Sequence, residues 1–155
     1  SSDLLATLMR YMLYEVKEDK VPLWKEIEYL QNYIDIQEQR FGETVKMKVD
    51  LQGVDESYTI EPMLLIPFVE NAFKHGTLLI EEAEIDIGLN MTGDMLNFSV
   101  NNKFNNMPEA VKDKTHGIGL ANVKKRLSLL YGDNHHLRIT QAGNWFNITL
   151  QLNLH

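Results

Sequence analysis

The spacing of apolar residues changes along the chain and separates helices from strands. Between residues 4 and 16 the apolar positions recur at steps of three and four, which predicts a helix with one buried stripe. After a charged break, a second stripe runs from Trp24 to Phe41, and we expect its helix to start near Pro22 and to end at Gly42. Two such helices with a short link predict a helical hairpin or part of a larger bundle. The first stripe consists of Leu5, Leu8, Met9, Met12, Leu13 and Val16.

After Gly42 the pattern changes to strict alternation of apolar and polar positions, which is the two-residue period of a half-buried strand. Gly93 lies in a turn between two of these segments, so the sequence predicts a hairpin there. The predicted strands cover residues 45–51, 85–89, 96–100, 137–140 and 145–152.

Two further helices interrupt these strands. One is predicted from about Pro62 to His75 and ends at Gly76, and the other covers residues 120–130. Residues 101–116 are polar and lack either period, so we expect a long loop. The order of elements is α-α-β-α-β-β-α-β-β. From Gly42 onward we therefore expect one α/β domain with two layers, in which helices cover one face of a mixed sheet.

Composition excludes several classes of function. The chain has 155 residues, 44% of them hydrophobic, which suffices for one packed core plus an appendage. A formal net charge of -7 argues against nucleic acids or anionic membranes as partners, since both require a basic face. The chain has no cysteine, which removes disulfides and thiolate chemistry. The apolar helical pattern begins almost at residue 1, which suggests a fragment of a longer protein.

The most informative stretch is Pro-Phe-Val-Glu-Asn-Ala-Phe-Lys-His-Gly at residues 67–76. Asn71, Lys74 and His75 are three and four residues apart, so they project from nearly the same side of a helix whose other side is apolar. An asparagine carbonyl is a hard oxygen ligand suited to Mg²⁺, which usually shares its coordination with waters and phosphates. The alternative is an ordinary amphipathic helix with a solvated polar side.

A second stretch, His-Gly-Ile-Gly-Leu-Ala-Asn-Val at residues 116–123, leads into the next helix. Gly117 and Gly119 let the backbone approach a ligand closely, and the helix start presents unpaired N–H groups to an anion. Asn122 adds a side-chain donor. The stretch therefore predicts a phosphate seat. The alternative is a glycine-rich helix entry followed by a solvated basic face.

Together, in this order and with a hairpin and a long loop between them, the two stretches resemble the N box and the glycine-rich box of the GHKL ATPase superfamily. Within it, residues 67–76 and 117–123 look like the LytS-like sensor histidine kinases, and the helix over residues 26–41 is similar to the one that precedes the catalytic domain in that family. The resemblance implies a Bergerat-type sandwich preceded by an N-terminal helical hairpin. Residues 1–41 would be a remnant of the dimerisation and phosphotransfer region, and residues 42–155 the ATP-binding catalytic domain.

The resemblance also implies Mg-ATP as ligand and transfer of its γ-phosphate to a histidine. Asn71 would bind Mg²⁺, Lys74 and His75 would lie by the phosphates, and residues 103–116 would form a lid. The phosphate-binding turn would consist of Gly117, Gly119 and Leu120. Implied partners are the phosphoacceptor helix of the parent kinase, a response regulator and, at full length, a second copy of the chain. The module would be the cytoplasmic part of a membrane-anchored sensor.

One departure from the family concerns adenine. The family usually has Asp-Asn-Gly after the strand that here covers residues 96–100, and its aspartate accepts a hydrogen bond from the adenine amino group. This chain reads Asn-Asn-Lys-Phe at residues 101–104. Asn102 continues the inward face of the strand, so we place it at the aspartate's position. Its carbonyl accepts without charge, which predicts weaker adenine binding. The alternative is a polar turn after the strand.

The second departure is that no histidine precedes His75, so we expect the phosphoacceptor outside this chain. Three hypotheses follow. The first is an active kinase module that does not label itself. The second is a docking module whose nucleotide site has degenerated, as the residues at 102–104 suggest. The third is another GHKL ATPase, such as a serine kinase of the anti-sigma type, which the N-terminal helices argue against.

Overall fold

The computed structural model describes residues 5–6, 19–51, 57–77, 80–105 and 118–154. The predicted first helix and most of the predicted lid lie outside these ranges, as does Gly117. Among the described helices, none combines the length and the apolar character needed to cross a membrane.

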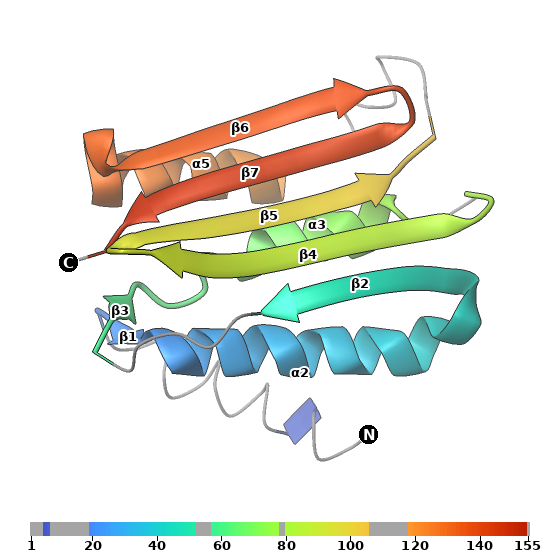
Figure 1. Ribbon diagram of the computed structural model, residues 1–155, viewed down its shortest axis with the longest axis horizontal. Helices are drawn as coiled ribbons and strands as arrows, with labels where there is room; N and C mark the ends of the chain where they lie inside the picture. Colours follow the sequence, from blue (N-terminus) through green and yellow to red (C-terminus); the bar gives the residue numbers. More distant parts are fainter. Residues whose placement is uncertain (1–4, 7–18, 52–56, 78–79, 106–117, 155) are drawn as a thin grey trace.

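A mixed five-stranded sheet forms one layer of the molecule (Figure 1). The strand order is β2-β4-β5-β7-β6, in which β2 and β4 are parallel and the other neighbours are antiparallel. The predicted hairpin is β4–β5, and the last two predicted strands form the hairpin β6–β7. The strands are β2 (Val45–Leu51), β4 (Ala83–Thr92), β5 (Met95–Lys103), β6 (His135–Ala142) and β7 (Trp145–Asn153).

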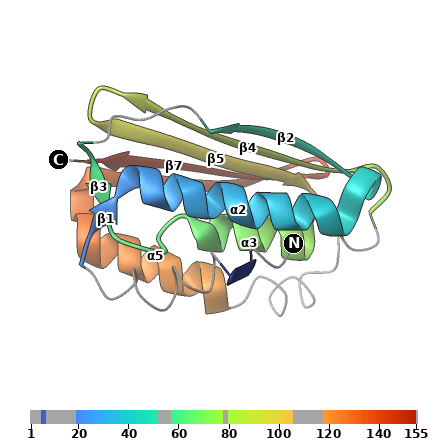
Figure 2. The same ribbon diagram turned by 90° about the horizontal axis from the view of Figure 1, so that it is seen from below.

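Three helices form the other layer, all on the same face of the sheet (Figure 2). They are α2 (Leu23–Phe41), α3 (Ile66–His75) and α5 (Ile118–Tyr131), with α3 lying between the other two. Short 3₁₀ turns follow two of them, η2 (Gly42–Thr44) after α2 and η3 (Gly132–Asn134) after α5. This arrangement confirms the predicted two-layer α/β fold with helices on one face of a mixed sheet.

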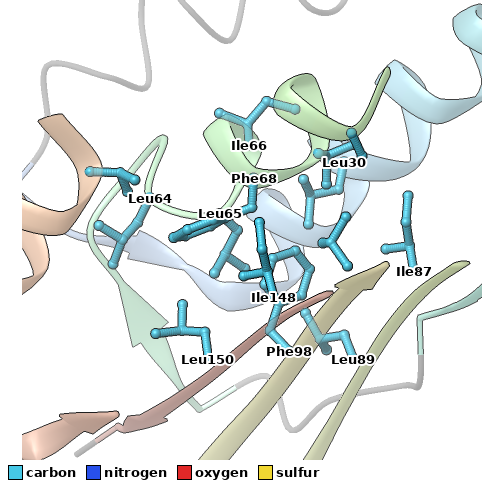
Figure 3. Close-up of a cluster of buried hydrophobic side chains, with 14 of the residues drawn as sticks. Leu30, Leu64, Leu65, Ile66, Phe68, Ile87, Leu89, Phe98, Ile148 and Leu150 are labelled. Atoms are coloured by element: carbon cyan, nitrogen blue, oxygen red, sulfur yellow. The ribbon is translucent and has the colours of Figure 1, made fainter. Parts of the chain in front are cut away.

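The core lies between the two layers, because the three central strands β4, β5 and β7 bury alternate side chains under the helices. Apolar side chains from β4, β5 and β7 meet those from the helices there (Figure 3). The rings of Phe68 on α3 and Phe98 on β5 pack edge to face with centroids 6.4 Å apart. Full burial of a phenylalanine contributes about 1.5–3 kcal/mol, so this contact fixes α3 firmly on the sheet.

Helix α2 packs into this same core. Leu23, Leu30 and Ile34 are buried with the residues of α3 and the sheet. The described part of the predicted helical lead is therefore the third helix of the sandwich layer. The domain boundary that we placed between residues 41 and 42 stays a prediction, and the packing of α2 gives it no support.

The structure also contains a short sheet that the sequence analysis did not predict. In it, β1 (Val21–Pro22) pairs antiparallel with β3 (Thr59–Ile60), and the N–H of Leu23 donates to the carbonyl oxygen of Tyr58 at 2.9 Å. Pro22 therefore precedes the helix instead of occupying its first turn. Two paired residues carry no recognisable period, which is why the pattern could not reveal these strands.

Two predicted boundaries were wrong. Helix α3 begins at Ile66 and not near Pro62, because residues 61–65 form turns in which Met63 has a left-handed φ of 62°. The loop predicted from residue 101 begins later, because β5 extends to Lys103 by pairing with Trp145 on β7.

Candidate functional site

A groove with a volume of about 720 Å³ lies over α3, between α2 and α5. The structure brings most of the predicted site residues together in its wall. From the sequence prediction, these are Asn71, Lys74, His75, Gly119, Leu120 and Asn122. Gly117 lies outside the described residues. A concave site of this size, lined by a few polar groups on an apolar base, is typical of small-molecule binding.

Asn71 is the most informative side chain in the groove. It is buried, with 8% of its surface exposed, and its amide nitrogen Nδ2 has no hydrogen-bond partner within the described part of the chain. A buried amide group without a partner destabilises the folded state by about 1–3 kcal/mol. Such an amide is expected where a ligand supplies the missing contacts.

The opposite wall is the first turn of α5. A Cβ atom added to Gly119 would meet no heavy atom of the described residues within 4 Å, and Gly119 lines the groove. The first four N–H groups of an α-helix have no acceptor within the helix, and they carry the positive end of its dipole. The groove therefore combines an unsatisfied amide on α3 with exposed backbone donors on α5.

Asn102 lies on β5, where the sequence analysis placed it, facing inward and only 1% exposed. Its Nδ2 donates to the carbonyl oxygen of Lys103 at 2.9 Å, and its Oδ1 has no partner within the described residues. The opposite amide orientation would bring two oxygens together, so the free atom is the acceptor. Among the described residues, Asn102 is not part of the groove wall.

Gly76 explains how Asn102 approaches the end of α3. A Cβ atom on Gly76 would lie 2.9 Å from Cβ of Asn102 and 3.0 Å from its Nδ2. Only a glycine lets the strand and the end of the helix come this close. The sequence analysis treated Gly76 as a helix terminator alone, and its second role follows from a contact that no local pattern encodes.

The α2 side of the groove was missed by the sequence analysis. Phe73 on α3 packs edge to face with Tyr33, at 5.9 Å between centroids, and is stacked on Phe41 at 6.2 Å. The guanidinium of Arg40 lies over the Phe41 ring, 5.1 Å from its centroid. The predicted apolar stripe that ends at Phe41 indicated burial of this helix face, but not that aromatic rings border a groove.

Glu70 adds a carboxyl group to this side of the groove. Desolvation by the neighbouring side chains raises the pKa of Glu70 above its ordinary value, although the residue is exposed at the surface. Burial, followed by the nearby Glu70 charge, raises the pKa of the Tyr33 hydroxyl to about 12. Arg40 in the same wall acts in the opposite direction and lowers the pKa of Tyr33.

This pKa shift predicts how the variant Glu70→Gln responds to pH. A carboxyl group whose pKa is raised by folding binds its proton more tightly in the native state, so it lowers stability once the pH rises above the ordinary value of 4.5. We expect Glu70→Gln to match the parent chain near pH 3.5 and to be more stable at pH 7, as measured by urea unfolding. Glu38→Gln, which removes an exposed carboxylate from α2, should change little at either pH. An equal gain at both pH values would contradict this account.

Comparisons with known proteins match most of this chain to histidine kinases. Residues 2–45 match the histidine kinase family. The sensor histidine kinase YpdA of Escherichia coli K12 is 30% identical over 151 residues, which cover 90% of this chain and 26% of YpdA. The sensor protein LytS of Oceanobacillus iheyensis is 28% identical, over 87% of this chain and 25% of LytS. The chain thus spans about a quarter of the length of these relatives.

Solved structures show the same fold at lower identity. The catalytic domain of the histidine kinase ThkA superimposes with a TM-score of 0.59 and 19% identity, covering 86% of this chain and 93% of that domain. ThkA in complex with the response regulator TrrA gives a TM-score of 0.57 and 18% identity, over 96% of this chain and 46% of the kinase.

Proposed function

This chain belongs to the sensor histidine kinases that resemble LytS, and we propose that it is their ATP-binding catalytic module. It binds Mg-ATP in the groove between α3 and α5 and directs the γ-phosphate to a histidine on a separate helix. The observation that carries the proposal is the buried side-chain nitrogen of Asn71, which has no partner among the described residues and lines one groove with the exposed Gly119.

The residues of the groove fit Mg-ATP. The described part of the chain contains no cluster of three or more histidine, aspartate or glutamate side chains that could hold a metal by themselves. This suits Mg²⁺, which is usually held by one or two protein oxygens together with phosphates and waters. We assign the metal to the side-chain carbonyl of Asn71 and the phosphates to Lys74, His75, Asn122 and the first turn of α5.

When bound, ATP supplies the phosphoryl group that a histidine nitrogen accepts while ADP leaves. The chain's own contribution to such a transfer is positioning and electrostatic stabilisation, with little covalent work. The net charge of -7 makes Lys74 and the α5 dipole important, because the remainder of the molecule repels a polyphosphate. We assign the adenine amino group to Oδ1 of Asn102, which has no partner among the described residues; because Asn102 is not part of the groove wall, this contact runs through water.

Calorimetry tests the proposal. Titration of the chain with ATP is expected to show binding that requires Mg²⁺, and the loaded chain should phosphorylate a separately supplied acceptor helix without labelling itself. A silent titration at millimolar Mg-ATP would favour the second candidate, a docking module with a degenerate nucleotide site. The observation that favours this alternative is the neutral Asn102 at the position where the family usually has an aspartate.

Gly119→Ala separates stability from binding. Because no atom of the described part of the chain lies within 4 Å of the new methyl group, the protein should accept it, and the better helix propensity of alanine should stabilise the fold by about 0.5–1 kcal/mol. The methyl group would stand where the phosphates approach, so we expect Mg-ATP affinity to fall about tenfold, as measured by calorimetry. Ser128→Ala, an exposed position on the same helix and outside the groove wall, is the matched control and should bind normally. Unchanged affinity in Gly119→Ala would contradict the proposal that the first turn of α5 binds the phosphates.

The family also suggests partners for the parent protein. A response regulator is bound to the related kinase ThkA, and we propose that a response regulator receives the phosphoryl group here as well. We further propose that the parent protein is a homodimeric, membrane-anchored sensor and that this module lies on its cytoplasmic side.

A further inference from the structure

The peptide at Met63 is held from two sides. Met63 has φ 62°, a left-handed conformation that residues other than glycine rarely adopt. Its N–H donates to a carboxylate oxygen of Glu26 on α2. On the other side, Nη1 of Arg126 on α5 donates to the Met63 carbonyl oxygen at 3.3 Å, and Nη2 donates to the Pro62 carbonyl oxygen at 2.9 Å.

These contacts are well shielded and are reinforced nearby. Glu26 is only 2% exposed, and the hydroxyl of Tyr131 at the end of α5 donates to the buried carboxylate of Glu61 at 2.5 Å. A strained backbone conformation persists only where the surroundings determine it, and such residues concentrate at functional sites. The segment from Glu61 to Met63 therefore joins α2 to α5 immediately before α3 begins.

The segment is placed so that it sets the geometry of the groove. Arg126 lies seven residues after Gly119, about two turns along the same face of α5, and both line the groove. Met63 also lines the groove and stands three residues before α3, the helix that carries Asn71. A contact between Arg126 and Met63 thus links the two walls.

We propose that Arg126 is a positioning residue that holds α5 at a fixed distance from α3 through the Pro62 and Met63 carbonyls, with Glu26 fixing the other side of the same peptide. The inference rests on the proposed function, because it concerns the wall that would bind the phosphates. A direct contact between Arg126 and a phosphate is the competing explanation. Glu26 distinguishes the two, since among the described residues it is not part of the groove wall.

Calorimetry with Mg-ATP on the full chain compares three kinds of variant. Arg126→Ala and Glu26→Ala should each weaken binding about tenfold, comparable to one hydrogen bond with a charged group, and the double variant should be no weaker than either. Glu26→Gln retains an acceptor for the Met63 N–H and should restore most of the affinity. Lys125→Ala removes an exposed positive charge from the same helix and should stay within about twofold of the parent chain.

Normal affinity in a folded Glu26→Ala, or additive losses in the double variant, would overturn the proposal in favour of direct phosphate contact. If Glu26→Ala fails to fold, amide hydrogen exchange at Met63 in the nucleotide-free protein supplies the test. Exchange there should be at least about tenfold faster in Arg126→Ala than in the parent chain and unchanged in Lys125→Ala. Equal exchange in Arg126→Ala and the parent chain would also overturn the proposal. Because this readout needs no nucleotide, failure of the parent chain to bind Mg-ATP would count against the proposed function alone.

Discussion

Replacing Asn71 with leucine is expected to stabilise the free protein and to remove Mg-ATP binding. Leucine has the same branched arrangement of heavy atoms and a better helix propensity, and it eliminates the buried amide nitrogen that has no partner among the described residues. The free energy of unfolding should rise by about 1 kcal/mol, which corresponds to a few degrees in melting temperature for a domain of this size. The affinity for Mg-ATP should fall by about 100-fold or more, because the variant lacks the carbonyl oxygen that we propose as the Mg²⁺ ligand.

Thermal unfolding and calorimetry on the same samples measure both effects. Asn32→Leu makes the same substitution on α2, outside the groove wall, and should leave Mg-ATP binding unchanged. Opposite changes in stability and binding are the signature of a residue kept for a ligand at the expense of the fold. If Asn71→Leu binds Mg-ATP with an affinity within about threefold of the parent chain, Asn71 is not the Mg²⁺ ligand.

Gly76→Ala is expected to have the largest effect on stability. The new Cβ atom would lie 2.5 Å from the carbonyl oxygen of Ala72 and 2.9 Å from Cβ of Asn102, so either the last turn of α3 or strand β5 must move. The φ of Gly76 is -99°, which any residue adopts, so the effect is steric and not conformational. We expect a loss of about 2–4 kcal/mol in the free energy of unfolding.

Urea unfolding measures this loss, and Gly88→Ala provides the matched control. At Gly88 the nearest atom to the added methyl group is the Ser99 side-chain oxygen at 3.1 Å, which can rotate away, so the cost should stay below about 1 kcal/mol. Similar losses in both variants would mean that the contact between Gly76 and Asn102 is not tight in solution.

The sequence predicted most elements of the fold because their side chains face two different environments. Residues 85–89 and 96–100 alternate since one face of the sheet is buried under helices, and that alternation is visible in any single strand. The order of the strands in the sheet could not be predicted in this way, because it depends on contacts between residues far apart in the sequence. The pairing of β5 with β7 joins Lys103 to Trp145, and no local period records a contact across such a separation.

The site was predictable to the extent that it follows from two short segments. The positions of Asn71, Lys74 and His75 on one helix side came from spacing, and the placement of Asn102 came from counting inward positions along β5. Met63 and Arg126 could not be found in this way, because their contact depends on a left-handed residue in a turn and on a side chain from a helix 63 residues away. The predicted start of α3 was wrong because the same left-handed residue, Met63, keeps the chain in a turn until Ile66.

The antiparallel pairing of β5 with β7 has a consequence for the connection between β5 and α5, residues 104–117. Its two flanking elements are secured independently, β5 by the sheet and α5 by the helix layer. For any chain segment that joins two fixed ends, the free-energy cost of closure rises by only about 0.6 kcal/mol for each doubling of its length. Insertions or deletions here should therefore leave the sandwich intact, which makes this connection the place where related kinases can diverge in length at little thermodynamic penalty.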